Sequence, residues 1–258
     1  MSPAGVPLVL IERHGPVAVL RLNRPEKRNA VNGHLATAIV DAVAVCQDAR
    51  VIVVTGEGPA FCAGLDLRNL GVDRLSELAP FIGAVAASTV PTIAAVNGPA
   101  VTGGFEMALA CDFMVASTSA GFADTHLRVG VYPGPVLVDL PRRVGMAMAR
   151  EMSLTGNFVD AATALRIGLV NHVVEPDQLM SFSMGLAAAI AEQDPAMVAT
   201  MRRDWDDTAT LPRAEAYRRH AEHARVGGFT TVGSDTLRAN MAAVVERARS
   251  RAANPTGA

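Results

Sequence analysis

Glu106 is the residue of this 258-residue chain whose type and surroundings most clearly suggest chemistry. It is the only charged residue between Gly103 and Cys111, and its neighbours there are typical of a protein core. A carboxylate in such a place must be paired, neutral or functional, because burying an isolated charge is costly. By itself the pattern leaves two interpretations open: a structural glutamate that accepts backbone hydrogen bonds, and an acid–base group.

Two glycine-rich loops could present backbone N–H groups to a ligand. The first contains Ala63, Gly64 and Leu65 after an apolar strand, and we expect Asp66 to cap a helix that follows it. In the second, Gly103 and Gly104 open a short helix, where the first N–H groups have no partner within the helix. Both loops could therefore stabilise negative charge on a bound molecule.

Two groups of residues that contain histidine are candidates for chemistry. Asp124, His126 and Arg128 lie together in a predicted loop and form a candidate proton-transfer cluster, although a single histidine is more often structural or solvated. His220 and His223 are three residues apart among charged neighbours. For this second pair we expect a solvated helix face and no metal site.

Composition excludes several classes of protein. The 23 Lys and Arg residues nearly balance the 25 Asp and Glu residues, and no long basic run exists, so nucleic acid is not an expected partner. Half of the residues are hydrophobic, which indicates a globular protein with a large core. No clean apolar run of about 18 residues and no secretory pattern occur, so no membrane association is expected.

Several cofactor and metal classes are excluded in the same way. Three cysteines without CxxC spacing favour a reducing, cytoplasmic location over a disulfide framework or a zinc cluster. Lys27 is the only lysine, which argues against a Schiff-base cofactor and a phosphate-binding P-loop. Phe61 stands where a dinucleotide-binding GxGxxG loop needs its third glycine. HExxH and GxSxG are absent from the sequence.

Hydrophobic periodicity predicts an α/β fold in which strands alternate with helices up to about residue 174. Beyond Pro176 it predicts helices alone, each starting near Pro, Ser or Asp. We place a boundary at Asp194-Pro195, which gives a core of residues 1–194 and a helical C-terminal region of residues 195–258. The predicted strands are 6–11, 17–22, 50–54, 92–96, 112–116 and 170–174, and the predicted helices are 33–47, 103–111, 136–143, 146–155, 160–167, 176–192, 195–209, 212–226 and 234–251.

These segments, together with Leu22–Ala30, Ser153–Gly156 and Gly168–Val174, resemble the crotonase (enoyl-CoA hydratase/isomerase) superfamily. The resemblance runs from about Val6 to Val174, with several motifs in register. It implies a crotonase-like ββα spiral core that binds acyl-CoA thioesters. It also implies that the helical C-terminal region assembles a homotrimer or a dimer of trimers.

Carried over to this sequence, the resemblance places the oxyanion hole on the backbone N–H groups of Leu65 and Gly103. Such donors would stabilise the enolate that forms when charge moves onto a thioester oxygen. Glu106 matches the first of two catalytic glutamates used by hydratases of the family, and His126 occupies the position of the second. A histidine can exchange protons near neutral pH, so we count His126 as a candidate catalytic residue.

The resemblance also implies a coenzyme A site. The loop Glu26-Lys27-Arg28 and the stretch 63–68 match positions that hold the nucleotide and pantetheine parts, and Lys27, Arg28 and Arg68 would face the phosphates. The alternative is that these are ordinary exposed basic residues. The predicted substrate-binding residues are Lys27, Arg28, Ala63, Gly64, Leu65, Asp66, Leu67, Arg68, Gly103 and Gly104.

The sequence therefore favours a cytoplasmic enzyme of fatty-acid metabolism that adds water to a trans-2-enoyl-CoA, without a metal or a cofactor other than the coenzyme A of its substrate. Other crotonase chemistry, either decarboxylation or isomerisation of an acyl-CoA, is the first alternative. A non-catalytic acyl-CoA-binding protein is the second, because the oxyanion loops could persist without a working acid pair.

Overall fold

The computed structural model describes residues 5–66 and 78–229, and a few positions between 237 and 249. The chain forms two compact units, Met1–Glu192 and Gln193–Ala258. The first contains every described strand, as well as the helices α1 to α7. The second contains α8 and α9.

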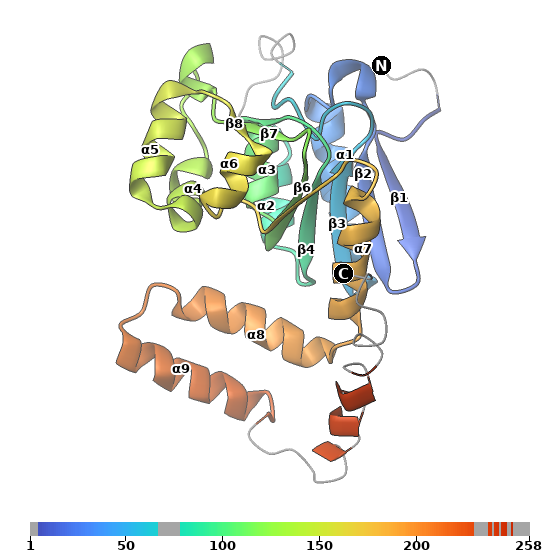
Figure 1. Cartoon of the computed structure of the whole chain (residues 1–258), viewed down its shortest axis with the longest axis vertical. Coiled ribbons are helices and arrows are strands. Elements are labelled where there is room, and N and C mark those ends of the chain that lie inside the picture. Colours follow the sequence, from blue (N-terminus) through green and yellow to red (C-terminus); the bar gives the residue numbers. More distant parts are fainter. Residues whose placement is uncertain are drawn as a thin grey trace. The chain divides into compact units, whose positions relative to one another are not determined.

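A six-stranded sheet forms the centre of the first unit (Figure 1). Its order is β1-β2-β3-β4-β6-β9, with an antiparallel β1–β2 hairpin and parallel pairing throughout the rest. The α/β prediction is thus confirmed. The strands are β1 (Val9–His14), β2 (Val17–Leu22), β3 (Val51–Gly56), β4 (Thr92–Val96), β6 (Phe113–Ser117) and β9 (His172–Val174).

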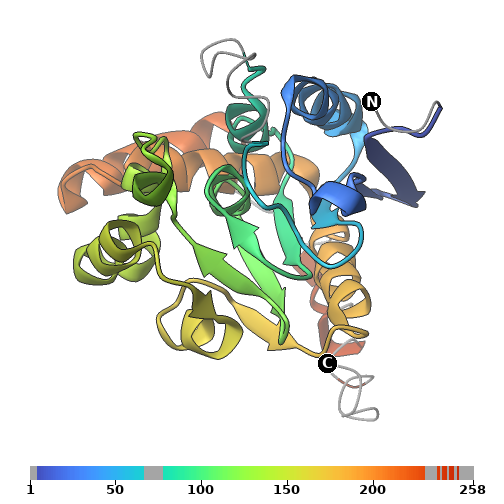
Figure 2. The same ribbon diagram turned by 90° about the horizontal axis from the view of Figure 1, so that it is seen from above.

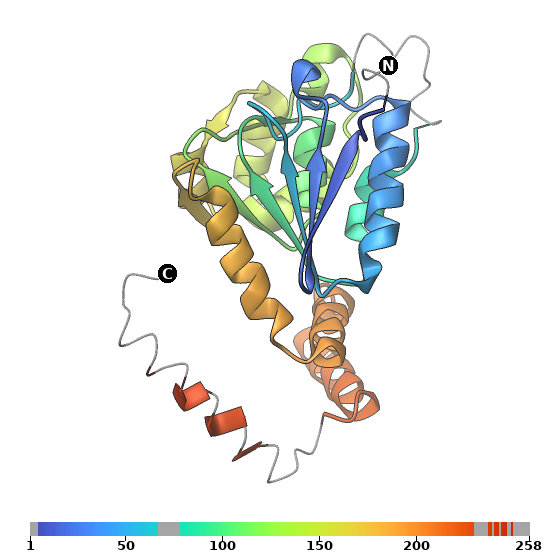
Figure 3. The same ribbon diagram turned by 90° about the vertical axis from the view of Figure 1, so that its right-hand side faces the viewer.

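Helices cover both faces of this sheet, which explains why the central strands β3 and β4 are buried along their whole length. On one face Val51 and Val53 pack in a core with α7 (Leu179–Ala191). On the other face Ile52 and Val54 belong to the larger core under α1 (Gly33–Val45), α2 (Phe81–Ala86) and α3 (Gly103–Leu109). Figure 3 shows α7 and α1 on opposite sides of the strands.

A second, small sheet lies beyond the carboxyl ends of β4 and β6. It consists of β5 (Ala100–Val101), β7 (Gly121–Ala123) and β8 (Val159–Asp160), in the order β5-β7-β8. The chain runs from β4 through β5 into α3, and then from β6 through β7 into the 3-10 helix η4 (His126–Val129). Successive strand–strand–helix turns therefore bring α3 and η4 to the same end of the main sheet.

The remaining helices of the first unit are short. The helices α4 (Val136–Val144), α5 (Met146–Thr155) and α6 (Ala161–Arg166) lie on the β9 side of the sheet, opposite the β1–β2 hairpin (Figures 1 and 2). Two further 3-10 turns are η1 (Pro25–Lys27) and η2 (Cys46–Asp48). No helix in the described ranges is long and apolar enough to cross a membrane.

The second unit pairs α8 (Pro195–Thr208) with α9 (Arg213–Val226). Asp194 caps α8 by accepting a hydrogen bond from the N–H of Met197 at 2.8 Å, as expected of an aspartate before a helix-starting proline. His220 and His223 both contact the Asp204 carboxylate of α8, at 2.5 and 2.9 Å. The expectation of a solvated face was wrong for His223, whose side chain is only 13% exposed.

Two sequence predictions fall on residues outside the described ranges. The helix expected after Asp66 begins there, and half of the residues of the helix expected at 234–251 lie there as well, whereas the other half are described and helical. The assignment of acyl-CoA binding to residues 1–194 and of assembly to residues 195–258 stays a prediction.

Candidate active site

Leu65 is held in place by a pairing between its loop and the segment 28–31. The N–H of Val31 donates to the carbonyl of Gly64 at 2.7 Å, and the N–H of Asp66 donates to the carbonyl of Val31 at 2.8 Å. Because peptide groups alternate in direction along an extended chain, the N–H of Leu65 points away from Val31. It has no hydrogen-bond acceptor among the described residues. This N–H is therefore free to receive a ligand.

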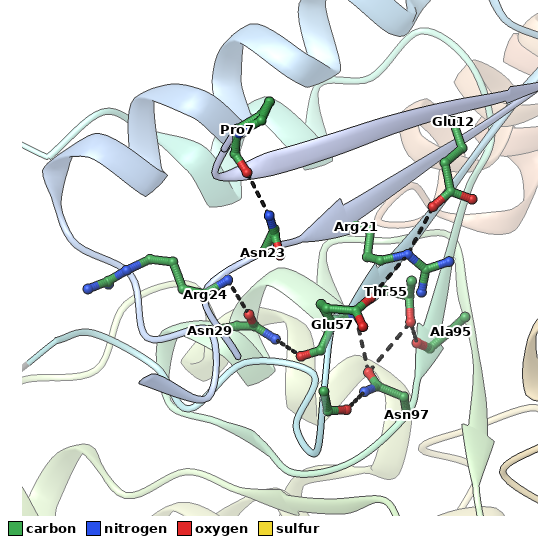
Figure 4. A network of polar contacts seen from close by, with 12 residues as sticks. Pro7, Glu12, Arg21, Asn23, Arg24, Asn29, Thr55, Glu57, Ala95 and Asn97 are labelled. Atoms are coloured by element: carbon green, nitrogen blue, oxygen red, sulfur yellow. Dashed lines mark hydrogen bonds and ion pairs between the residues drawn. The ribbon is translucent and has the colours of Figure 1, made fainter. Parts of the chain in front are cut away.

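Asn29 anchors the chain that leads into the same loop, and Figure 4 shows its side chain between Arg24 and Glu57. Its fully buried side-chain amide donates to the carbonyls of Glu57, Ala60 and Phe61 at 2.9 to 3.2 Å and accepts from the N–H of Arg24 at 2.9 Å. Buried carbonyl groups are costly to leave unpaired, so one amide fixes the path of the loop that ends at Leu65.

Gly103 begins α3 directly beside Leu65. Its N–H has no partner within the helix and no other acceptor in the described part of the chain. A Cβ atom on Gly103 would lie 3.7 Å from Cγ of Leu65, and one on Gly64 would lie 1.9 Å from Oγ1 of Thr102. The two loops thus touch, and Gly64 combines this contact with a φ of +90°, which explains why it is a glycine.

Glu106 lies one turn into α3 and is only 4% exposed. Its Oε1 accepts a hydrogen bond from the N–H of Val136 at 3.2 Å. Burial raises the pKa of the Glu106 carboxyl above its ordinary value, and the N–H groups of Val136 and Gly134 and the His126 ring oppose this shift without cancelling it. Glu106 is therefore a carboxylate suited to accept a proton.

His126 opens η4 and is 5% exposed. Its Nε2 lies 3.7 Å from Oε2 of Glu106, and its Nδ1 lies 2.6 Å from Oδ1 of Asp124. Burial lowers the pKa of the imidazole, but the hydrogen bond to Asp124 and the negative charges of Glu106 and Asp124 outweigh burial and raise it overall. The structure thus brings a proton acceptor and a proton donor together in one buried site.

Arg128, the third member of the predicted loop cluster, lies elsewhere. Its guanidinium donates to the carbonyl of Thr155 and to the side chain of Asn157 at the surface. The grouping of Arg128 with Asp124 and His126 was therefore wrong. The closeness of these residues in the sequence suggested the grouping, but in the 3-10 helix η4 the side chains of His126 and Arg128 point in different directions.

The structure describes most of the predicted coenzyme A residues. Lys27 and Arg28 are exposed, and the carbonyl of Arg28 accepts from the N–H of Ala63 at 2.9 Å. The Asp66 carboxylate contacts the guanidinium of Arg24 at 3.3 Å. Leu67 and Arg68 lie outside the described residues.

Gly104 has a packing role that the sequence did not reveal. A Cβ atom there would lie 2.3 Å from the carbonyl oxygen of Cys62, so only glycine lets α3 approach this loop. Its contact with substrate stays a prediction. Asn29, Gly134 and Val136 were missed as site residues, because their contributions come from contacts about 30 residues apart that no local pattern shows.

Among the described residues, no three His, Cys, Asp or Glu side chains gather in a way that could hold a metal ion. The described site instead consists of two free N–H groups, a buried carboxylate and a buried imidazole tied to a second carboxylate. This set can stabilise a developing oxyanion and move protons on and off an adjacent atom.

Comparisons with known proteins show which family the chain is similar to. The chain is 42% identical over 193 residues to a Rhizobium meliloti protein named "Probable enoyl-CoA hydratase", covering 71% of this chain and 75% of that protein. It is 36% identical over 184 residues to a crotonyl-CoA hydratase of Syntrophomonas wolfei, covering 67% and 71% of the two chains.

Solved structures show the same fold. An enoyl-CoA hydratase from Mycobacterium tuberculosis matches with a TM-score of 0.71 and 40% identity over 84% of this chain and 98% of its own. One from Bacillus anthracis matches with a TM-score of 0.83 and 26% identity over 93% and 96%. The predicted crotonase-like architecture with a helical C-terminal region is confirmed. The profile of the enoyl-CoA hydratase/isomerase family matches residues 12–250, and the chain belongs to this family, within the crotonase superfamily.

Proposed function

We propose that the protein is a hydro-lyase that adds water to the double bond of a trans-2-enoyl-CoA. The observation that carries the proposal is the buried pair formed by Glu106 and His126, 3.7 Å apart, next to the free N–H groups of Leu65 and Gly103. Family membership supports acyl-CoA as the substrate class.

The reaction follows from the protonation states that the site favours. The Glu106 carboxylate takes a proton from water while the water oxygen bonds to Cβ of the substrate. The electrons of the double bond move onto the thioester oxygen, where the two N–H groups stabilise the enolate. The imidazolium of His126 then gives its Nε2 proton to Cα. A proton passed from Glu106 to His126 restores the site, so no metal, redox cofactor or cofactor other than coenzyme A is required.

The remaining predictions complete this proposal. Lys27 and Arg28 are exposed beside the Leu65 loop, where they can bind the phosphates of coenzyme A. Arg68 keeps the same predicted role. We propose a homotrimer or a dimer of trimers, because α8 and α9 contain no buried residue and expose apolar side chains such as Trp205. A cytoplasmic place in fatty-acid metabolism stays a prediction.

Steady-state hydration of crotonyl-CoA and longer enoyl-CoAs, beside a calorimetric titration of acyl-CoA binding, tests the proposal. Turnover that depends on Glu106 supports a hydratase. Tight binding without turnover of any enoyl-CoA would instead favour the non-catalytic binder. Turnover of other acyl-CoAs by isomerisation or decarboxylation alone would favour the other crotonase chemistries.

A further inference from the structure

Asp124 is a buried carboxylate that the proposed reaction does not use directly. It follows β7 and is 1% exposed. Strand β7 pairs with β5, and the carbonyl of Ala123 accepts a hydrogen bond from the N–H of Thr102, the residue before Gly103. Asp124 is thus attached to the same backbone framework that presents the Gly103 N–H.

Asp124 makes two hydrogen bonds to His126. Its Oδ1 lies 2.6 Å from Nδ1 of His126 and also accepts from the backbone N–H of His126 at 3.4 Å. Its Oδ2 has no hydrogen-bond partner in the described part of the chain. Burial acts to raise the pKa of Asp124, but hydrogen bonding from His126 and the nearby Ser153 hydroxyl lower it overall. Asp124 is therefore ionised and can only accept hydrogen bonds.

This fixes which nitrogen of the imidazole can exchange a proton. A carboxylate acceptor at Nδ1 requires that Nδ1 carries the hydrogen. The other nitrogen, Nε2, then faces Oε2 of Glu106 at 3.7 Å. Proton exchange is thereby confined to the side of the ring that faces the second catalytic group.

Asp124 also offsets the cost of charging a buried ring. Burial alone would hold His126 neutral, and the charged groups acting on the ring among the described residues are Asp124 and Glu106. Asp124 cannot itself deliver the proton to substrate across this geometry, because it contacts the opposite nitrogen of the ring. Its effect must pass through His126.

We infer that Asp124 is a positioning residue that holds His126 protonated at Nδ1 with Nε2 directed at Glu106, so that Nε2 is the single exchange point for the proton delivered to substrate. Delivery of the proton to substrate rests on the proposed hydratase function. The protonation and orientation of the His126 ring can be tested without turnover.

Nitrogen-15 NMR of histidine-labelled protein across pH measures the protonation of the two nitrogens of the His126 ring. The spectrum of H126Q identifies the His126 signals among those of the six histidines. In the wild type we expect Nδ1 to stay protonated at every pH while Nε2 titrates. In D124N the ring should titrate at lower pH and lose its fixed tautomer. A wild-type ring protonated at Nε2 and bare at Nδ1 in its neutral form would overturn the inference, even if D124N does not fold.

Kinetics of D124N test the link to catalysis. We expect kcat for crotonyl-CoA hydration to fall by about 10-fold to 100-fold, KM to change little, and the high-pH limb of the pH profile to move to lower pH, because the imidazolium is lost earlier. The matched control is D160N, which alters an exposed helix-capping aspartate of the same small sheet. D160N should affect stability and leave the pH profile unchanged.

The outcomes separate the two proposals. A wild type without hydratase activity but with the predicted ring behaviour would refute the hydratase and keep the positioning of His126. An active wild type whose pH profile and ring titration are unchanged in D124N would refute the positioning and keep the hydratase. A D124N that loses stability alone, as D160N does, would also refute it.

Discussion

Glu106 is a carboxylate whose surroundings oppose its ionisation, and this opposition is what makes it a usable base. Burial raises its pKa, while one backbone N–H from Val136 keeps the charged form accessible. Stability and function therefore conflict at this residue. The conflict can be measured, because a neutral amide keeps the size of the side chain and can still accept the hydrogen bond.

We predict that E106Q loses at least about a hundredfold in turnover and becomes more stable than the wild type as pH rises. The folded-state pKa of Glu106 is raised, so ionisation costs stability as pH increases from the ordinary glutamate value through the raised one, and below both values the cost vanishes. Melting temperatures at pH 4 and pH 8 check this, with E151Q at an exposed position of α5 as the control. A lower melting temperature of E106Q at pH 8 would contradict the assignment.

Gly134 supports the Glu106 carboxylate in a way that a single added carbon tests. A Cβ atom at Gly134 would lie 2.9 Å from Oε1 of Glu106, which is closer than van der Waals contact allows. We predict that G134A displaces the carboxylate and lowers kcat by about tenfold or more, with a small change in melting temperature. G185A in α7, where a Cβ meets open space, is the control. Equal kcat values for the two variants would show that the carboxylate position is unimportant.

At the scale of elements, the site depends on two loops that meet rather than on any one helix. Segment 28–31 and the Asn29 amide fix the loop that presents Leu65, and Thr102, at a φ of 44°, turns the chain into α3 so that Gly103 faces it. Thr102 is a non-glycine residue in an unfavourable backbone region, and such strain is tolerated where neighbouring contacts enforce it.

We predict that G64A abolishes the alignment of the two N–H groups. The alanine would combine a left-handed φ of +90° with a Cβ position 1.9 Å from Oγ1 of Thr102, so one loop must move. Turnover should fall by about 10² to 10³, the usual effect of losing one oxyanion donor. G15A in the β1–β2 turn shares the positive φ without the clash and should keep full activity. A G64A enzyme with normal kcat would exclude Leu65 from the oxyanion hole.

The elements differ in how far the sequence could predict them. The strands β3, β4 and β6 were predicted because burial on both faces requires continuous apolar runs. The two- and three-residue strands β5, β7 and β8 were not, since such short segments leave no periodic signal and form only when the chain stacks on itself. Glu106 and His126 were predicted as candidates from residue type. Their 3.7 Å contact depends on those short strands.

At the scale of the whole molecule, the helical C-terminal unit leaves several large apolar side chains exposed. The described helices α8 and α9 contact each other, and Met197, Met201, Trp205 and Tyr217 are all more than 40% exposed. Apolar side chains of this size on one helix pair are typical of an association surface. The proposed homo-oligomer would bury them.

We predict that light scattering at micromolar concentration gives three or six times the chain mass of 26.9 kDa. W205E should reduce this mass, because a charge would be buried in the interface. E215Q, a change at an exposed position of α9, serves as the control. A wild-type mass equal to that of one chain would contradict the proposed assembly.

The central claim is that Glu106 and His126 act together to hydrate an enoyl-CoA, and the most direct measurement is the pH dependence of crotonyl-CoA hydration by the wild type, E106Q and H126A. We predict a bell-shaped wild-type profile, whose low-pH limb reports Glu106 and whose high-pH limb reports His126. E106Q should lose nearly all turnover. H126A should lose most of the rate together with the high-pH limb, and H126E, which restores an acid at this position, should recover part of the rate. Hydration that survives in E106Q, or an unchanged pH profile in both His126 variants, would contradict the account.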